Sequence, residues 1–199
     1  MTATPREGFK ARLRALSRRQ QIAFMAALCE RLLPNYGLYA QMTGQGDPGT
    51  LRVVLDLAWE SLMVREAKID FARQADKLSE AEPPEDDESF GARRAVEVMM
   101  ALSTLLDALQ GEAPDAPLTI SGLSKSGVQA VVEMTEEAED DDVERAAARL
   151  REHPLMADER GFQEAVLEAA EARLDREALK ALRRLGRNDG VSNLGLSLE

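Results

Sequence analysis

Arg52, Asp56 and Glu60 stand four residues apart, a spacing that places their side chains on one face of a helix. Asp56 and Glu60 are then like charges one turn apart, which destabilises a helix by about 0.2–0.5 kcal/mol. Arg52 can neutralise one carboxylate, and for the second we expect Arg31 first and Lys68 next. The pattern predicts either a polar network between two helices or a ligand or partner site, because perturbed charges concentrate at functional sites.

The stretch 20–71 around this pattern holds the only tryptophan, the only cysteine and both tyrosines of the chain. Because aromatic residues make up only 4% of the sequence, we expect Trp59 to be a core residue, with a ligand platform as the alternative. The candidate ligand or partner site comprises Arg31, Asn35, Tyr36, Arg52, Asp56, Trp59, Glu60 and Lys68.

The sequence contains no set of residues that is typical of nucleophilic catalysis. His153 is the only histidine, and it precedes a proline at a predicted helix end, where an exposed position is typical. Cys29 lies on the apolar face of a predicted helix, where cysteine packs as a small hydrophobic residue. The segment GQGDPG at 44–49 follows no predicted strand and lacks the lysine of a phosphate-binding loop. We therefore assign no catalytic residue.

Metal sites are also poorly supported by the composition. A di-iron carboxylate bundle needs Glu-x-x-His on two helices, whereas the single histidine has Leu150 three residues before it. The same shortage of Cys and His argues against a zinc site. A Mg²⁺ site of carboxylates alone stays open at Asp86, Asp87 and 140–142, although loop positions favour solvated charge there. We predict no metal and no cofactor.

Charge is distributed unevenly along this chain of net charge −11. Residues 76–144 hold 19 acidic and 4 basic residues, whereas residues 1–75 hold 7 acidic and 11 basic ones. A nucleic-acid partner is disfavoured, because phosphate contacts need clustered lysine and arginine. The exception is a basic N-terminal group of Arg6, Lys10, Arg12, Arg14, Arg18 and Arg19. We expect this group to be a solvated helix face.

The cysteine count and the hydropathy of the sequence indicate in which cellular compartment the protein lies. One cysteine cannot form an internal disulfide, which is typical of proteins from a reducing compartment. The N-terminal sequence MTATPREGFK lacks the apolar segment of a signal peptide, and no apolar run approaches the roughly 18 residues of a membrane span. We predict a cytoplasmic protein without a membrane partner.

The composition predicts an all-α fold. Alanine, leucine, glutamate and arginine dominate, and β-branched residues rarely alternate. We expect one domain over residues 1–199, a bundle of about 8–10 helices. An acidic linker at 82–89, EPPEDDES, is predicted to separate two helical halves, because two prolines and five acidic residues cannot pack a core.

Caps and prolines set the expected limits of the first helices. Ser17 and Gln20 match a capping box, and Pro34 is expected to end the helix that they begin. A short separate helix is predicted over 36–43, and Asp47 begins the next one. The sequence does not decide whether this helix continues to about residue 78 or is interrupted at 64–70.

The later helices are expected from apolar periodicity. A helix over about 92–109 should bury Val96, and another should begin near Ser124. Gly186 is expected to end the last helix. The tail at 191–198 carries enough apolar residues to dock on the bundle.

Five segments together resemble the YjaG-like family of bacterial proteins of unknown function. They are CERLLPNYGLY (29–39), TGQGD (43–47), LDLAWESL (55–62), SKSG (124–127) and VSNLG (191–195). The resemblance covers nearly the whole chain. It implies a compact, mainly helical cytoplasmic protein, and it implies no activity and no catalytic residues. The acidic linker and the following GARRA are more polar than the family pattern implies.

Three functional hypotheses follow. The first is a non-enzymatic protein-interaction or adaptor domain, with a protein partner or a second copy of the chain. The second is a small-ligand-binding protein or an enzyme that uses carboxylates and arginines of the first half. The weakest is association with nucleic acid through the basic N-terminal group.

Overall fold

The computed structural model describes residues 8–111, 113, 115–135 and 143–198. Within these ranges the fold is an all-α bundle of nine α-helices without a strand, which confirms the predicted fold class. The helices are α1 (Phe9–Ala15), α2 (Arg18–Thr43), α3 (Pro48–Met63), α4 (Phe71–Ser79), α5 (Phe90–Gln110), α6 (Ala116–Thr135), α7 (Val143–Glu152), α8 (Pro154–Glu171) and α9 (Arg176–Arg187). None of the described helices has both the length and the apolar run that a membrane-spanning helix requires.

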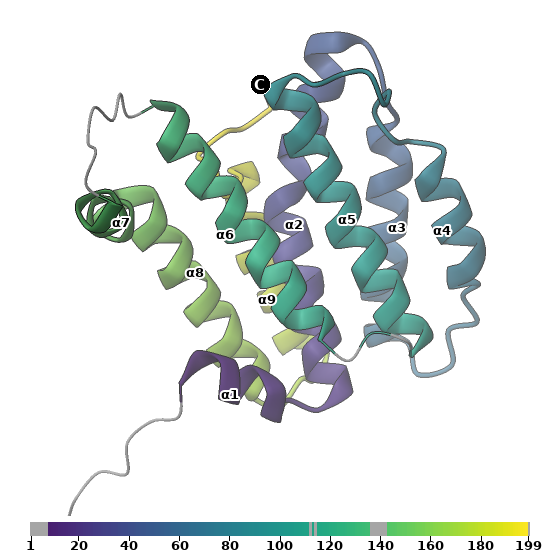
Figure 1. The fold of residues 1–199 in the computed structure, drawn as a ribbon. Coiled ribbons are helices and arrows are strands. Elements are labelled where there is room, and N and C mark those ends of the chain that lie inside the picture. The colour runs from purple at the N-terminus through teal and green to yellow at the C-terminus, as the bar shows by residue number, and fades with distance from the viewer. Residues whose placement is uncertain (1–7, 112, 114, 136–142, 199) are drawn as a thin grey trace, which may run out of the picture.

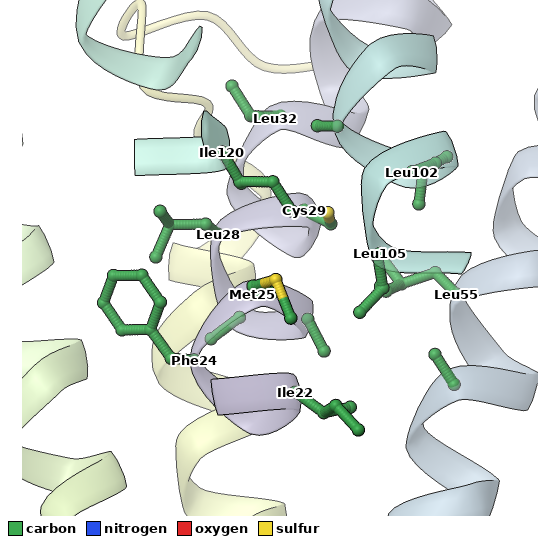
Figure 2. Close-up of a cluster of buried hydrophobic side chains, with 14 of the residues drawn as sticks. Ile22, Phe24, Met25, Leu28, Cys29, Leu32, Leu55, Leu102, Leu105 and Ile120 are labelled. Atoms are coloured by element: carbon green, nitrogen blue, oxygen red, sulfur yellow. The ribbon is translucent and has the colours of Figure 1, made fainter. Parts of the chain in front are cut away.

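Helix α2 lies at the centre of the bundle and contacts α3, α5, α6, α8 and α9 (Figure 1). Every residue from 22 to 32 is buried, which is typical of a helix that is covered on all sides. Figure 2 shows Phe24 and Leu28 on one side of α2, and Leu55 and Leu105 approaching from the other. Helices from both sides of the acidic linker therefore pack on the same element.

Pro34 does not end this helix, and that prediction is wrong. A proline in a helix interior removes the hydrogen bond to the carbonyl four residues earlier, here Glu30, at a cost of about 3 kcal/mol or more. Burial on both sides, for example of Leu32 and Tyr36, offsets this cost. The separate helix predicted over 36–43 is the last part of α2.

Side-chain caps begin several helices where the sequence predicts them. Ser17 and Gln20 form the expected capping box at α2. The Asp47 carboxylate accepts a hydrogen bond from the Thr50 amide at 3.1 Å and begins α3. The chain is not helical between α3 and α4, so the break at 64–70 exists, and Asp70 caps α4.

The later helices depart from the prediction at two points. Val96 is 41% exposed on α5 instead of buried. Helix α6 begins at Ala116, not near Ser124. The prediction began the helix too late because Gly122 and Gly127 disfavour helix. Glycine weakens a helix by only about 0.5–1 kcal/mol, and packing on neighbouring helices offsets that cost.

The acidic linker and the preceding Ala81 are tied to α2, although most linker residues are exposed. The Tyr36 hydroxyl donates to the Ala81 carbonyl at 2.5 Å, and the Tyr39 hydroxyl donates to Asp87 Oδ2 at 2.9 Å. Pro83 is buried. Two tyrosines therefore hold a highly charged segment in a fixed position.

The C-terminal tail docks on the bundle, as predicted. Ser192, Asn193 and Leu194 are buried. The Ser192 amide donates to the Leu196 carbonyl at 2.7 Å, and an isolated bridge pairs Val191 with Ser197. The tail is thus a folded turn.

Gly186 lies inside α9 and does not end it, so that prediction is also wrong. A Cβ at this position would lie 2.6 Å from the Ala27 carbonyl oxygen and 2.9 Å from the Ala27 Cα. The glycine therefore allows α9 to approach the backbone of α2. Asn188, in the left-handed conformation with φ 46°, follows the helix end instead.

We predict opposite effects for two Gly→Ala substitutions in helices. Gly186→Ala should destabilise the protein by about 1–3 kcal/mol, because its Cβ meets backbone that cannot rotate away. Gly122→Ala in α6 should stabilise it by about 0.5–1 kcal/mol, because nothing lies within 4 Å of its Cβ. Urea unfolding measures both. A stabilised Gly186→Ala protein would contradict the close contact between α2 and α9.

Candidate functional site

Three arginines surround the carboxylate of Glu30 on α2, and this glutamate is only 3% exposed. Arg52 of α3 binds both oxygens, with Nη1 to Oε2 and Nη2 to Oε1 each at 2.9 Å. Arg183 of α9 donates from Nε to Oε1 at 2.9 Å, and Arg187 Nε lies 3.5 Å from Oε2. Two-point pairing of this kind is among the stronger charged contacts in proteins.

Asp56 joins this cluster from α3. Arg183 donates from Nη2 to Asp56 Oδ1. Arg52 Nε lies 3.1 Å from the same oxygen but in a geometry that makes no hydrogen bond. Three arginines, including the half-exposed Arg187, therefore face the two carboxylates of Glu30 and Asp56. The cluster keeps one positive charge in excess.

Arg52 pairs with Asp56 as predicted, but the second cation of this carboxylate is Arg183 and not Arg31 or Lys68. Arg31 pairs instead with Asp158 of α8 at 2.7 Å, and its guanidinium stacks over the Phe162 ring at 4.1 Å. Glu60 and Lys68 are exposed, and neither forms an ion pair with any residue that the structure describes. The sequence therefore predicted that Asp56 needs a second cation from another helix, but it named the wrong residue.

Glu30, Arg183 and Arg187 were missed, although each left a signal. Glu30 stands inside a buried apolar run, where a carboxylate requires a charged partner. Arg183 and Arg187 are four residues apart on the last helix, which places both on one face. Nothing local in the sequence says that this face meets α2.

Trp59 is fully buried, as predicted for a core residue. Arg183 lies over its ring at 5.9 Å, so the indole supports one arginine of the cluster from inside. Its buried surface leaves no face for a ligand to stack on.

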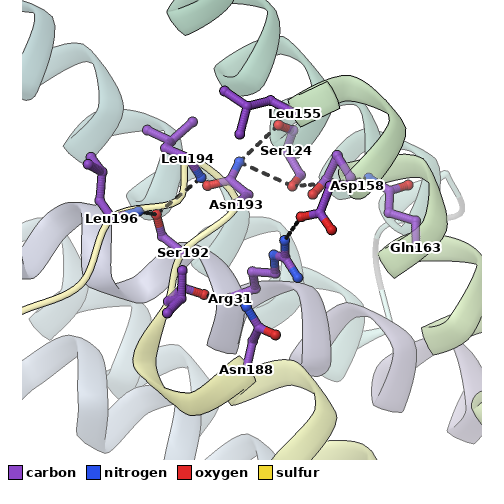
Figure 3. Close-up of polar contacts among 12 residues, drawn as sticks. Arg31, Ser124, Leu155, Asp158, Gln163, Asn188, Ser192, Asn193, Leu194 and Leu196 are labelled. Atoms are coloured by element: carbon purple, nitrogen blue, oxygen red, sulfur yellow. Dashed lines mark hydrogen bonds and ion pairs between the residues drawn. The ribbon is translucent and has the colours of Figure 1, made fainter. Parts of the chain in front are cut away.

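A second buried polar network joins the three segments CERLLPNYGLY, SKSG and VSNLG (Figure 3). Asn35 of α2 donates to Asn193 Oδ1 at 2.9 Å. Asn193 in turn donates to the Ser124 carbonyl at 3.0 Å. The network fixes the C-terminal tail against α2 and α6, so Asn35 serves the fold here.

Glu159 of α8 ends this network and is completely buried. Its Oε1 accepts hydrogen bonds from Ser124 Oγ at 2.5 Å and from Gln163 Nε2 at 2.6 Å. Its Oε2 has no hydrogen-bond partner among the described residues. Burial raises the pKa of Glu159, and the two hydrogen bonds and the charges of Arg31 and Lys125 offset only part of that rise.

A groove of about 480 Å³ runs between α4 and α5 and is closed at one side by the acidic linker. Leu78, Met99 and Met100 contribute apolar surface to it. Glu82 and Glu85 stand at its rim and are exposed. The groove therefore combines apolar walls with a negative edge.

The side chains that could act as a nucleophile or bind a metal, Cys29 and His153, stabilise the fold in this structure. Burial and the nearby Glu30 raise the pKa of the Cys29 thiol, which keeps it protonated and poorly reactive. His153 caps α8, where its Nδ1 accepts from the Leu155 amide at 3.2 Å. Within the described ranges no three acidic, histidine or cysteine side chains are grouped to hold a metal ion. The absence of a metal stays a prediction.

The basic N-terminal group is exposed at Lys10, Arg14, Arg18 and Arg19, as predicted, and Arg12 is the exception. Arg12 is 8% exposed and pairs with Glu164 and Glu171 of α8. Arg18 donates to the carbonyls of Ala108 and Leu109 at the end of α5. Two of its arginines therefore hold helices together, whereas Arg6 lies outside the described residues.

Comparison with known proteins assigns the chain to a family. Residues 8–197 match a family model described as a protein of unknown function, DUF416. This chain belongs to the DUF416 family. It is 38% identical over 190 residues to the uncharacterized protein YjaG of Escherichia coli K12, which covers 93% of this chain and 94% of that protein. The resemblance to YjaG-like proteins is thereby confirmed.

Two further relatives extend this comparison. An uncharacterized protein of Haemophilus influenzae is 35% identical over 191 residues, covering 93% of this chain and 94% of that one. The crystal structure of a DUF416 family protein from Shewanella baltica is 34% identical to this chain. It superposes with a TM-score of 0.89 over 97% of this chain and 100% of the other. The all-helical DUF416 fold described above agrees with that structure.

We predict that Glu30→Gln destabilises this DUF416 protein by about 3–5 kcal/mol, the usual cost of breaking a buried ion pair. The substitution keeps the side-chain shape but removes the negative charge that three arginines share. Urea unfolding measures the effect. Glu60→Gln, an exposed change on α3, is the control and should stay within about 0.5 kcal/mol. Equal stability of the two variants would contradict the role of Glu30.

We predict that the stability gain from Glu159→Gln grows with pH. Because the folded-state pKa of Glu159 is raised, the folded chain binds more protons, and wild-type stability falls as pH rises above the unfolded value of about 4.3. Glutamine removes this loss. Melting temperatures from pH 4 to pH 8 should therefore separate the variant from the wild type increasingly.

The control for this pH series is Glu66→Gln, an exposed carboxylate outside the network. Its melting temperature should follow the wild type at every pH. A difference between Glu159→Gln and the wild type that does not change with pH would show that the buried carboxylate carries no unusual protonation.

Proposed function

We propose that this protein is a non-enzymatic adaptor of the cytoplasm that binds a basic amphipathic segment of a partner protein. The binding surface is the groove between α4 and α5. One observation carries the proposal: an uncovered apolar stripe of α5 lies beside the acidic linker.

The apolar half of the argument comes from α5. Val96 and Met100 are four residues apart and thus share one helix face, and they are 41% and 49% exposed. Both line the groove together with the buried Met99 and Leu78. Exposed apolar surface gathered in a concave site typically marks an interaction surface, and methionine side chains adapt to different partners.

The acidic residues of the groove favour a partner segment with positive charge. Residues 76–89 contain seven acidic residues and one lysine. Glu82, Glu85 and Asp87 line the groove itself. Hydrogen bonds from Ser89 and Tyr39 lower the pKa of Asp87, so this carboxylate stays charged. A segment with lysine and arginine on one face and apolar residues on the other complements both parts of the groove.

The groove is also held in place before any partner arrives. Tyr39 of α2 holds the linker through Asp87, and Tyr36 holds Ala81, the residue before the linker. A preformed site loses less conformational entropy on binding, which favours affinity. Tyr36, a candidate site residue, thus supports the groove from behind.

The other hypotheses have less support. The candidate nucleophile Cys29 is buried and His153 caps α8, which favours a non-enzymatic role. A nucleic-acid partner has little support, because Arg12 pairs with carboxylates of α8 and Arg18 is bound to carbonyls of α5. We propose no membrane partner. A second copy of this chain on the groove is an outcome of the experiment below.

The test uses a fluorescent 18-residue helical peptide of leucine, methionine and lysine with an amphipathic pattern, and a scrambled peptide of the same composition. Fluorescence anisotropy should show saturable binding of the amphipathic peptide that weakens with salt. Val96→Arg should weaken binding about tenfold or more, because it places a cation in the groove.

The matched control is Val53→Arg on α3, since Val53 is 50% exposed and lies outside the groove. Its affinity should stay within about twofold of the wild type. Equal binding of the two peptides, or equal affinity of the two variants, would overturn the proposal. So would sedimentation showing a wild-type dimer that Val96→Arg dissociates, because the groove would then hold a second copy.

A further inference from the structure

We propose that a second groove, between α2, α3 and α9, binds a small aliphatic anion, with a carboxylate as its head group. Arg187 and Arg52 provide the charge, and apolar residues of α2 and α3 receive the aliphatic part. The groove has a volume of about 350 Å³ and uses none of the residues of the α4–α5 groove.

The cationic end of this groove is built on a buried counter-charge. Glu30, Arg52 and Arg187 all line it. Glu30 holds both Nη atoms of Arg52, so the position of that guanidinium is fixed. The cluster still has three arginines for the two carboxylates of Glu30 and Asp56, and an anion is the species that completes its charge balance.

Arg187 is the group that remains available. Its side chain is 50% exposed, its Nε is 3.5 Å from Glu30, and it makes no hydrogen bond within the described chain. By contrast, Arg183 donates from both Nε and Nη2. A guanidinium edge with free N–H groups matches the two oxygens of a carboxylate, which explains the choice of head group.

The rest of the groove is apolar. Leu33, Pro34, Pro48 and Leu198 line it, together with glycines at 37 and 190. An ideal Cβ on Gly37 would lie 2.8 Å from a methyl carbon of Leu198, so the notch that this glycine leaves already receives an aliphatic side chain. A ligand that joins an anionic head to an aliphatic tail therefore satisfies both ends of the groove.

Three probes separate the contributions of head and tail. Sodium octanoate carries both, 1-octanol carries the tail alone, and inorganic phosphate carries an anionic head alone. Calorimetric titration of the full chain should show saturable binding of octanoate, with the affinities of octanol and phosphate weaker by about tenfold or more. Octyl phosphate, a fourth probe, distinguishes a phosphate head from a carboxylate head and should bind more weakly than octanoate.

Arg187→Gln should weaken octanoate binding about tenfold, and Arg187→Lys should give an intermediate loss, because lysine keeps the charge but not the two-point geometry. Arg184→Gln is the matched control: it removes the same charge from the same helix turn but does not line the groove. Circular dichroism and melting temperature verify that each variant folds.

Equal octanoate affinity of Arg187→Gln and Arg184→Gln would overturn this inference, and so would equal binding of octanol and octanoate. The result is independent of the proposed peptide groove. Arg187→Gln should leave peptide binding unchanged, and Val96→Arg should leave octanoate binding unchanged.

Discussion

The burial of α2 on all sides between residues 22 and 32 is the constraint on which the rest of this structure depends. A helix covered on all sides cannot turn a charged residue toward water, yet α2 carries Glu30 and Arg31 in its most buried part. Each must therefore find its partner within the protein. Glu30 draws Arg183 and Arg187 of α9 together with Arg52 of α3, and Arg31 reaches a carboxylate of α8. The polar residues of the central helix thus determine how three surrounding helices are positioned.

The buried ion pairs of α2 affect both the stability of the fold and the choice of one packing arrangement. Apolar side chains of similar volume fill a core at lower cost than a buried ion pair. Glu30 favours the register of α3 and α9 that brings Arg52 and Arg183 to its carboxylate, whereas a leucine would accept several registers. Asn35 acts in the same way for the C-terminal tail, since its amide reaches Asn193 only when the tail turns against α6. In both cases a polar group on α2 selects one placement of a distant segment.

The sequence predicted what local chemistry determines and failed where the answer depends on distant segments. Caps such as Asp47, the all-α fold and the buried Trp59 follow from residue types and spacing. Pro34 and Gly186 were misread because local rules say that each ends a helix, whereas burial keeps α2 intact and close packing requires the glycine in α9. The second arginine at Asp56 was missed because Arg183 lies 127 residues away, whereas the local partner Arg52 was predicted.

The continuity of α2 through Pro34 connects the two proposed binding sites. Glu30 and Gly37 line the aliphatic-anion groove. Tyr36 and Tyr39 hold Ala81 and Asp87, at the start of and within the acidic linker that borders the peptide groove. Had Pro34 ended the helix, these residues would belong to two elements with an adjustable angle between them. On one helix their separation is fixed by a rise of about 1.5 Å per residue. The same unbroken backbone therefore positions an arginine cluster and an acidic rim, two surfaces of opposite charge, within a chain whose net charge is −11.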